Sequence, residues 1–241
     1  MSRALVPAAI VGGTAISYVA AALAGVPVLV PFLNVVPAFP FMVASLRRGR
    51  VGEAIWRMLI WAAALAVCAT VFSYLDTAAA GRLFLRGETY RREMFAYLTT
   101  GVGPEGDPRV FVPTHLTHAA VFCGLALLTG ASLAMTLGAA LMNYMAYYAG
   151  ALGAASVQPW KAMLLAWVPW ALIRIASFVT LGVVLGGPVL GRLLGFPFQL
   201  RAHVRWIALA AVGLGVDIFL KWTLAPAWRE MIRGAAGWAG R

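Results

Sequence analysis

Two histidines share one side of a helical turn at the start of a long apolar stretch. His115 and His118 stand at i and i+3 in the order H-x-x-H. That spacing places both imidazoles on one helix face, where they could hold a metal ion. Two histidines do not close a site, and no H-E-x-x-H motif is present. A third ligand would have to be an acid of the preceding loop, and Glu93 is our candidate. The alternatives are a ligand-contacting pair and ordinary hydrogen-bonding histidines.

Three charged residues interrupt apolar sequence farther along the chain. Arg174 lies inside one apolar run, and Asp217 and Lys221 lie one helical turn apart in the next. An unpaired charge at the centre of a bilayer costs roughly 2.5 to 3.5 kcal/mol on insertion scales, so we expect Arg174 and Asp217 to pair. An ionisable group at that depth suggests a functional site, and a structural salt bridge is the competing interpretation. Asn34 and Asn143 are further polar groups that could line the same interior.

The elements that carry these residues follow from composition. Of 241 residues, 62% are hydrophobic and 11% charged, whereas soluble domains carry roughly 25% charged residues. Since a membrane crossing needs about 20 mostly apolar residues, the sequence predicts an all-α bundle of about seven spans within one integral membrane domain, residues 1–241. The predicted spans are approximately 5–24, 28–46, 56–75, 113–132, 134–154, 161–187 and 204–225.

The first predicted span has a second interpretation. Arg3, a weak apolar stretch and Ala22-Leu23-Ala24 resemble a signal peptide with its cleavage site, which would leave six spans. Arg47, Arg48 and Arg50 mark the second connection as cytoplasmic, and residues 76–112 then form a long outer loop. The arginine-rich tail disagrees with this topology, and a helix lying on the membrane surface from Trp228 to Trp238 would accommodate it.

The outer loop contains an amphipathic segment. Tyr90, Met94, Tyr97 and Leu98 share one helical face, while the opposite face is charged. The pattern predicts an interfacial helix with its aromatic side toward the membrane, which either caps the bundle or acts as a lid over an outward-facing cavity.

Prolines in the second predicted span and glycines near the end of the sixth indicate where helices bend or pack closely. Four prolines surround Asn34 in the second span, which predicts a kinked or broken helix. Small residues at spacings of four suit close helix packing, a homodimer face or a face for other membrane partners. The glycines concerned are Gly182, Gly186, Gly187 and Gly191.

Several classes of function are disfavoured. The net charge is +11, but the basic residues are dispersed over loop ends, so we expect lipid and not nucleic acid as the partner. No phosphate-binding Gly-Lys loop is present, so we expect no nucleotide, and the only cofactor we consider is a metal at His115 and His118. All but two of the 19 basic residues are arginine, which with abundant alanine and glycine suggests a bacterial inner membrane.

The leading functional hypothesis is a small transport or permeation protein, or the membrane subunit of a transport complex. It would use an intramembrane polar site made from Arg174, Asp217, Lys221, Asn34 and Asn143. One alternative is a scaffold or assembly subunit that holds partners through its glycine faces. The other is a membrane-embedded enzyme with chemistry at the H-x-x-H pair.

Overall fold

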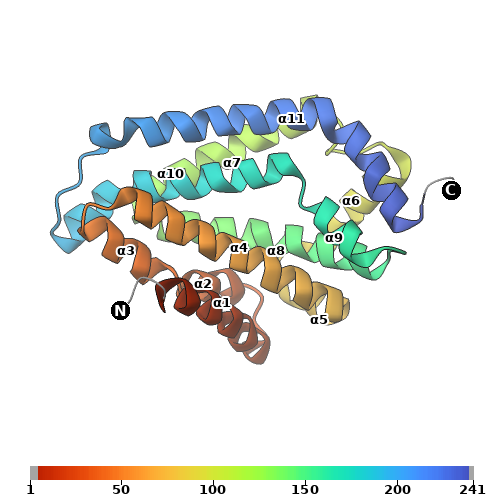
Figure 1. Ribbon diagram of the computed structural model, residues 1–241, viewed down its shortest axis with the longest axis horizontal. Coiled ribbons are helices and arrows are strands. Elements are labelled where there is room, and N and C mark those ends of the chain that lie inside the picture. Colours follow the sequence, from red (N-terminus) through yellow and green to blue (C-terminus); the bar gives the residue numbers. More distant parts are fainter. Residues whose placement is uncertain (1–4, 239–241) are drawn as a thin grey trace.

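The computed structural model describes residues 5–238, and this part of the chain is entirely helical, without strands (Figure 1). In chain order the helices are α1 (Leu5–Ala24), α2 (Leu29–Val35), α3 (Phe39–Arg47), α4 (Val51–Leu75), α5 (Thr77–Leu83), α6 (Gly87–Thr100), α7 (Pro108–Thr129), α8 (Ser132–Ala154), α9 (Pro159–Ala166), α10 (Pro169–Leu194), the short 3-10 helix η1 (Leu200–His203) and α11 (Val204–Ala236).

Five of these helices are long and apolar enough to cross a membrane, namely α1, α4, α7, α10 and α11 together with η1. The bent pair α2 and α3 brings the number to six if it forms one span. Length and composition thus give five or six candidate spans among the described helices, against about seven predicted. The chain is an all-α multi-pass membrane protein.

The predicted span at 134–154 accounts for the difference. This segment forms α8, which has the length of a span but is not among the helices that are apolar enough to cross a membrane. It packs against α2, α4, α6, α7 and α9, and most of its length is buried in the chain itself. A helix enclosed by protein does not need lipid-facing side chains, so it can carry Asn143, three tyrosines and several glycines.

The second span is broken, as its prolines predicted. α2 and α3 meet at an angle of 41° across a break of three residues that contains Pro37. At the break, the N–H of Ala38 donates to the carbonyl of Val35 and not to that of Asn34, which leaves the Asn34 carbonyl without its helical donor. The indole Nε1 of Trp61 donates a hydrogen bond of 2.7 Å to the carbonyl oxygen of Asn34, in the last turn of α2.

The run predicted as one span at 161–187 is also interrupted. α9 ends at Ala166, and α10 begins at Pro169 after Val168 has adopted an extended conformation with ψ of 143°. The residue before a proline is disfavoured in the helical region, and proline suits the first position of a helix. Arg174 consequently lies in the second turn of α10 and not in the middle of a span.

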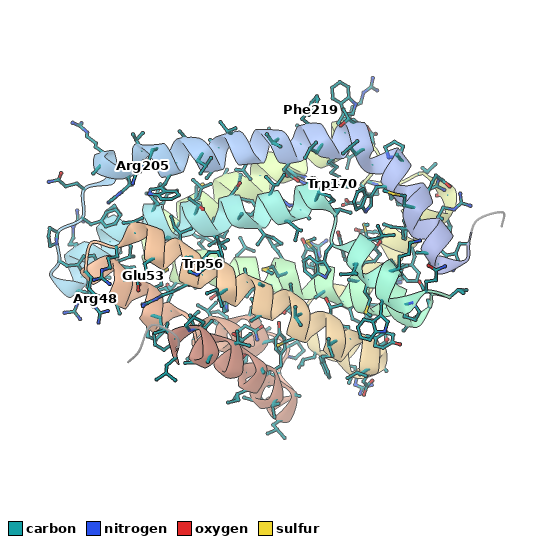
Figure 2. The ribbon with its side chains drawn as sticks, viewed as in Figure 1. Arg48, Glu53, Trp56, Trp170, Arg205 and Phe219 are labelled. Atoms are coloured by element: carbon teal, nitrogen blue, oxygen red, sulfur yellow. The ribbon has the colours of Figure 1, made fainter. Side chains whose placement is uncertain are left out.

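The outer surface of the bundle is apolar. Trp56 and Phe219, both labelled in Figure 2, are 63% and 58% exposed, and Leu23 and Leu128 are exposed too. Large exposed apolar surface is rare on soluble monomers and is expected where lipid is the solvent.

The two ends of the bundle differ in their connections. The α3–α4 connection and η1 lie at one end, while α6, α9 and the last turns of α11 gather at the other, which we call the loop end (Figure 1). α11 continues without a break to Ala236 and contains Pro226. The surface helix predicted for Trp228–Trp238 is thus the end of α11, which packs against α9.

Candidate functional site

Three side chains from three helices meet at Asp217. Its Oδ2 lies 3.7 Å from Nη1 of Arg174 on α10 and 3.7 Å from Nε2 of His115 on α7. Asp217 is 1% exposed, and neither carboxylate oxygen accepts a hydrogen bond from a described residue. The predicted pairing of Arg174 with Asp217 is present, and His115 joins it although the sequence did not connect them.

His115 has a defined orientation. Its Nδ1 lies 2.7 Å from the carbonyl oxygen of Phe111, one turn earlier, and its Nε2 contacts Nη1 of Arg174. The carbonyl can only accept and the guanidinium can only donate, so a neutral imidazole with its proton on Nδ1 satisfies both partners. In this state Nε2 faces both the arginine and the carboxylate.

A second ion pair lies one helical turn away along α11. Nζ of Lys221 is 2.7 Å from Oε2 of Glu105, which belongs to the loop between α6 and α7. Lys221 is 2% exposed and also lies 4.5 Å from the ring centroid of Phe111, a distance suited to a cation–π contact. Lys221 therefore turns inward to a loop acid and does not extend toward the membrane surface.

A small cavity of about 40 Å³ lies beside these ion pairs at the loop end. Such a volume can hold a few water molecules. Its wall combines aromatic, basic and apolar side chains with one acid. The lining includes Tyr90, Tyr97, Glu105, Tyr148, Trp170, Arg174, Lys221, Trp228 and Arg229.

The hydroxyl of Tyr148 is the unsatisfied polar group of this wall. Tyr148 is 2% exposed, and its buried oxygen has no hydrogen-bond partner among residues 5–238. Buried polar groups are hydrogen-bonded in the large majority of cases. Tyr148 is also one of the residues that line the cavity.

α6 covers the cavity with the face that the sequence singled out. Tyr90, Met94, Tyr97 and Leu98 all line it, and the ring of Tyr90 packs 4.6 Å from that of Tyr144 on α8. The aromatic side thus faces the protein, which corrects the prediction that it faces the membrane interface. Burial raises the pKa of Tyr90 well above its usual value.

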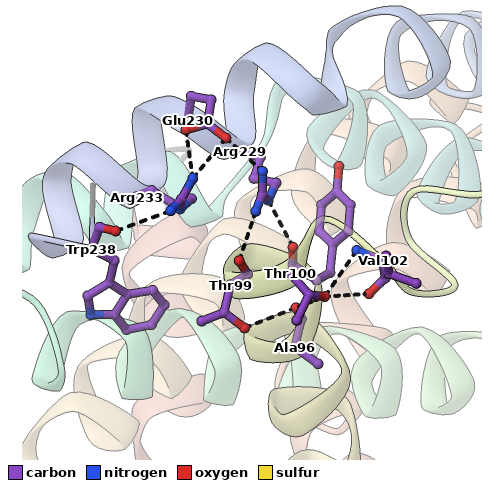
Figure 3. Close-up of polar contacts among 9 residues, drawn as sticks. Ala96, Thr99, Thr100, Val102, Arg229, Glu230, Arg233 and Trp238 are labelled. Carbon is purple, nitrogen blue, oxygen red and sulfur yellow. Dashed lines mark hydrogen bonds and ion pairs between the residues drawn. The ribbon is translucent and has the colours of Figure 1, made fainter. Parts of the chain in front are cut away.

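Both ends of α6 are tied to the bundle. Near its start, Glu88 accepts hydrogen bonds from Arg91 and from the Tyr147 hydroxyl of α8, the latter at 3.0 Å. At its end, Arg229 of α11 donates a hydrogen bond of 2.9 Å to the carbonyl oxygen of Tyr97. It donates another of 3.0 Å to the carbonyl oxygen of Thr99 (Figure 3). A cation placed on the free carbonyls of a helix C-terminus is favourable.

Asn34 and Asn143 belong to a separate polar network. Asn143 donates to Asn34, Asn34 donates to Ser17, and Tyr18 donates to Asn143, at 2.6 to 2.9 Å. Within residues 5–238, no hydrogen bond or ion pair connects this network to Arg174, Asp217 or Lys221. The predicted intramembrane site therefore divides into two groups.

The candidate metal ligands do not converge. No group of three His, Cys, Asp or Glu side chains in the described part of the chain is arranged to hold a metal ion. Both ring nitrogens of His115 already have protein partners, one of them a cation, and Glu93 lies on the exposed side of α6. His118 lies one turn farther along α7, partly buried. A neighbouring guanidinium opposes binding of a metal cation by charge repulsion.

Other segments of the same protein pack against the glycines proposed for a partner face. Gly182 packs against Phe122 and Met135, and Gly186 packs against Ala131. The aromatic ring of Phe198 covers Gly187 and also contacts Gly191. These small residues let helices approach within the protein, so they are not available as the proposed face.

Sequence reasoning missed several residues of the cavity, among them Trp170, Trp228 and Arg229. Trp170 and Trp228 lie edge to face at 5.8 Å, and Figure 2 shows Trp170 near the loop end. The grouping of tryptophan and arginine beyond Pro226 is a signal for Trp228 and Arg229, although by itself it predicts a surface helix.

No family model, curated protein or solved structure matches this chain.

Proposed function

We propose that this chain is a small transport or permeation protein, or the membrane subunit of a transport complex, and that its polar site is the cluster of His115, Arg174 and Asp217 with the adjoining cavity. The observation that carries the proposal is Asp217, a fully buried carboxylate on a span helix whose two oxygens accept no hydrogen bond from residues 5–238. Ionisable groups in such places mark substrate, ion or proton pathways.

The arrangement is poor as a purely structural salt bridge. A salt bridge that holds two helices together stabilises most when its guanidinium and carboxylate are also hydrogen-bonded. Burying a charge costs several kcal/mol unless its partners are well placed. Here Arg174 and Asp217 are 3.7 Å apart, beyond hydrogen-bond distance. A carboxylate held by charge attraction without hydrogen bonds can change partners more readily than one fixed by them, which suits a group that acts during a cycle.

The structure gives less support to the two alternatives, a scaffold subunit and a membrane-embedded enzyme. A scaffold was argued from a glycine face that this chain buries within itself, and an enzyme was argued from ligands that do not converge. We keep a bacterial inner membrane as the proposed location, with α6 and the cavity on its outer side, from the arginine distribution of the loops.

The test is flux through the purified protein in liposomes. Inward gradients of sodium acetate, potassium phosphate or glycine are imposed, and an internal pH-sensitive dye reports coupled proton movement. We expect flux with wild-type protein and its loss in Asp217→Asn. Glu93→Gln is the control, because it removes an exposed acid that lies outside this cluster and does not line the cavity.

Folding is measured alongside flux by thermal unfolding and gel filtration of each variant. If Asp217→Asn folds normally and loses flux, the proposal is supported. If it carries wild-type flux, or cannot fold at all, Asp217 is dispensable or structural and the proposal is wrong.

A further inference from the structure

We infer that the cavity at the loop end binds a small anionic group, a carboxylate or phosphate. In the absence of such a group, the carboxylate of Glu105 pairs with Lys221 in its place. The inference names the ligand class of the proposed transport site and rests on that function only for the movement of the ligand, not for its binding.

Donors outnumber acceptors around the cavity. The guanidinium of Arg174 offers five N–H groups, and one of its nitrogens has a hydrogen-bond partner among the described residues. Lys221 offers three N–H groups and uses one on Glu105. The unpaired hydroxyl of Tyr148 adds a further donor. All three residues line the same cavity, so an anion in it would be surrounded by these donors.

The wall also discriminates by charge. Arg174, Lys221 and Arg229 line the cavity, and Glu105 is the acidic residue in the lining. Asp217 lies against Arg174 but is not part of the lining. A cation entering the cavity would therefore meet basic side chains first, while an anion would be attracted.

Charge balance explains why Glu105 should exchange with the ligand. The two ion pairs contain two cations, Arg174 and Lys221, and two carboxylates, Asp217 and Glu105. The third basic residue of the wall, Arg229, is balanced by Glu230. Adding a third negative charge to a buried site is costly, whereas replacing one carboxylate by another anion keeps the balance. The carboxylate of Glu105 is thus an internal substitute for the ligand on Lys221.

The position of Glu105 in the chain suits this exchange. It lies on the only connection between α6 and α7, a turn-rich segment in which Gly101 and Gly103 have φ of +76° and +154°. Glycine adopts such conformations without a steric penalty. The side chain of Glu105 is 27% exposed, so it can withdraw to solvent while the lysine it contacts stays buried.

Binding is tested in neutral detergent by titrating the intact protein with inorganic phosphate and with acetate, followed by calorimetry. Glu105→Gln removes the competing carboxylate, and we expect affinity to increase about tenfold, the equivalent of one ordinary charge interaction. Tyr148→Phe should weaken binding about tenfold, since it removes a hydrogen bond to a charged acceptor. Glu93→Gln, an exposed acid of α6, should leave binding unchanged.

Tyr148→Phe also separates a binding role from a structural one. It removes a hydroxyl that has no partner in the described structure, so the variant should unfold at the wild-type temperature or above it. Weaker anion binding with undiminished stability supports the inference. It is overturned if neither phosphate nor acetate binds, if Glu105→Gln binds no more tightly, or if Tyr148→Phe binds as wild type. Should Glu105→Gln fail to fold, the Tyr148→Phe result decides.

The source of the anion is identified in nanodiscs. Phosphate that binds in phosphatidylcholine discs but is excluded when phosphatidylglycerol is added indicates a lipid headgroup in the cavity. Binding that persists in both indicates a soluble anion. Anion binding without flux would leave this inference standing while the transport proposal fell, and flux without anion binding would do the reverse.

Discussion

The side-chain amide of Asn143 on α8 donates a hydrogen bond of 2.9 Å to the amide oxygen of Asn34 on α2, across 109 residues of sequence. Both side chains are buried, and Tyr18 and Ser17 of α1 complete their hydrogen bonding. This network fixes the broken second span and α1 to the central helix α8.

Replacing Asn143 by alanine should destabilise the protein by about 1 to 3 kcal/mol, because it leaves the Asn34 oxygen and the Tyr18 hydroxyl without their buried partner. Tyr18→Phe removes one bond of the same network and should cost less. Chemical unfolding in detergent measures both. Thr223→Ala, which alters an exposed hydroxyl bonded to its own helix, is the control. Equal stability of Asn143→Ala and the control would show that the network is energetically unimportant.

Gly150 permits a very close helix approach in the core, between α8 and α4. A Cβ at this position would lie 2.6 Å from the carbonyl oxygen of Thr70 and 2.7 Å from the amide nitrogen of Tyr74. Backbone atoms cannot move aside as a flexible side chain can, so Gly150→Ala should destabilise by about 1 to 3 kcal/mol or more.

Gly124→Ala on α7 is the matched variant, because a Cβ added at Gly124 would meet no atom of another helix within 4 Å. It should be neutral or stabilise by up to about 1 kcal/mol, since alanine favours the helix. Thermal unfolding of the two variants should move in opposite directions. A shared loss of stability would mean that glycine flexibility, and not close packing, is what matters at Gly150.

Glu88 gives the protein a pH-dependent contribution to stability. The hydrogen bond from Arg91, aided by that from Tyr147, lowers the pKa of this carboxyl below its usual value, although partial burial opposes the shift. A carboxyl with a lower pKa in the folded state stabilises above the unfolded pKa of about 4.3, and the contribution is lost as pH falls through the folded value. Since Glu88 is substantially exposed, the effect should be modest.

The measurement is the unfolding temperature of wild type and Glu88→Gln between pH 7 and pH 3. Wild type should be the more stable at pH 7, and the difference should shrink below about pH 4 as Glu88 becomes protonated. Glu93→Gln, on the exposed face of the same helix, should show no such convergence. A gap between wild type and Glu88→Gln that is constant over this range would contradict the assignment.

The sequence by itself determined the class of the protein, the positions of most of its helices and its most unusual charges. Long apolar runs with few charges can only be stable in lipid as helices, because every backbone group must be satisfied within the segment. The same local rules predict a kinked or broken second span and the amphipathic face of α6, which depend on residues only a few positions apart.

Only the tertiary structure decided which of these residues meet. Apolar sequence does not distinguish a helix surrounded by lipid from one surrounded by protein, so it predicts a lipid-facing span for α8 and a membrane-facing aromatic side for α6, both of which pack within the protein. The partner of a buried charge likewise depends on helix packing and loop placement. Lys221 therefore binds Glu105, 116 residues away, and Asn143 meets Asn34 in a network apart from Arg174 and Asp217.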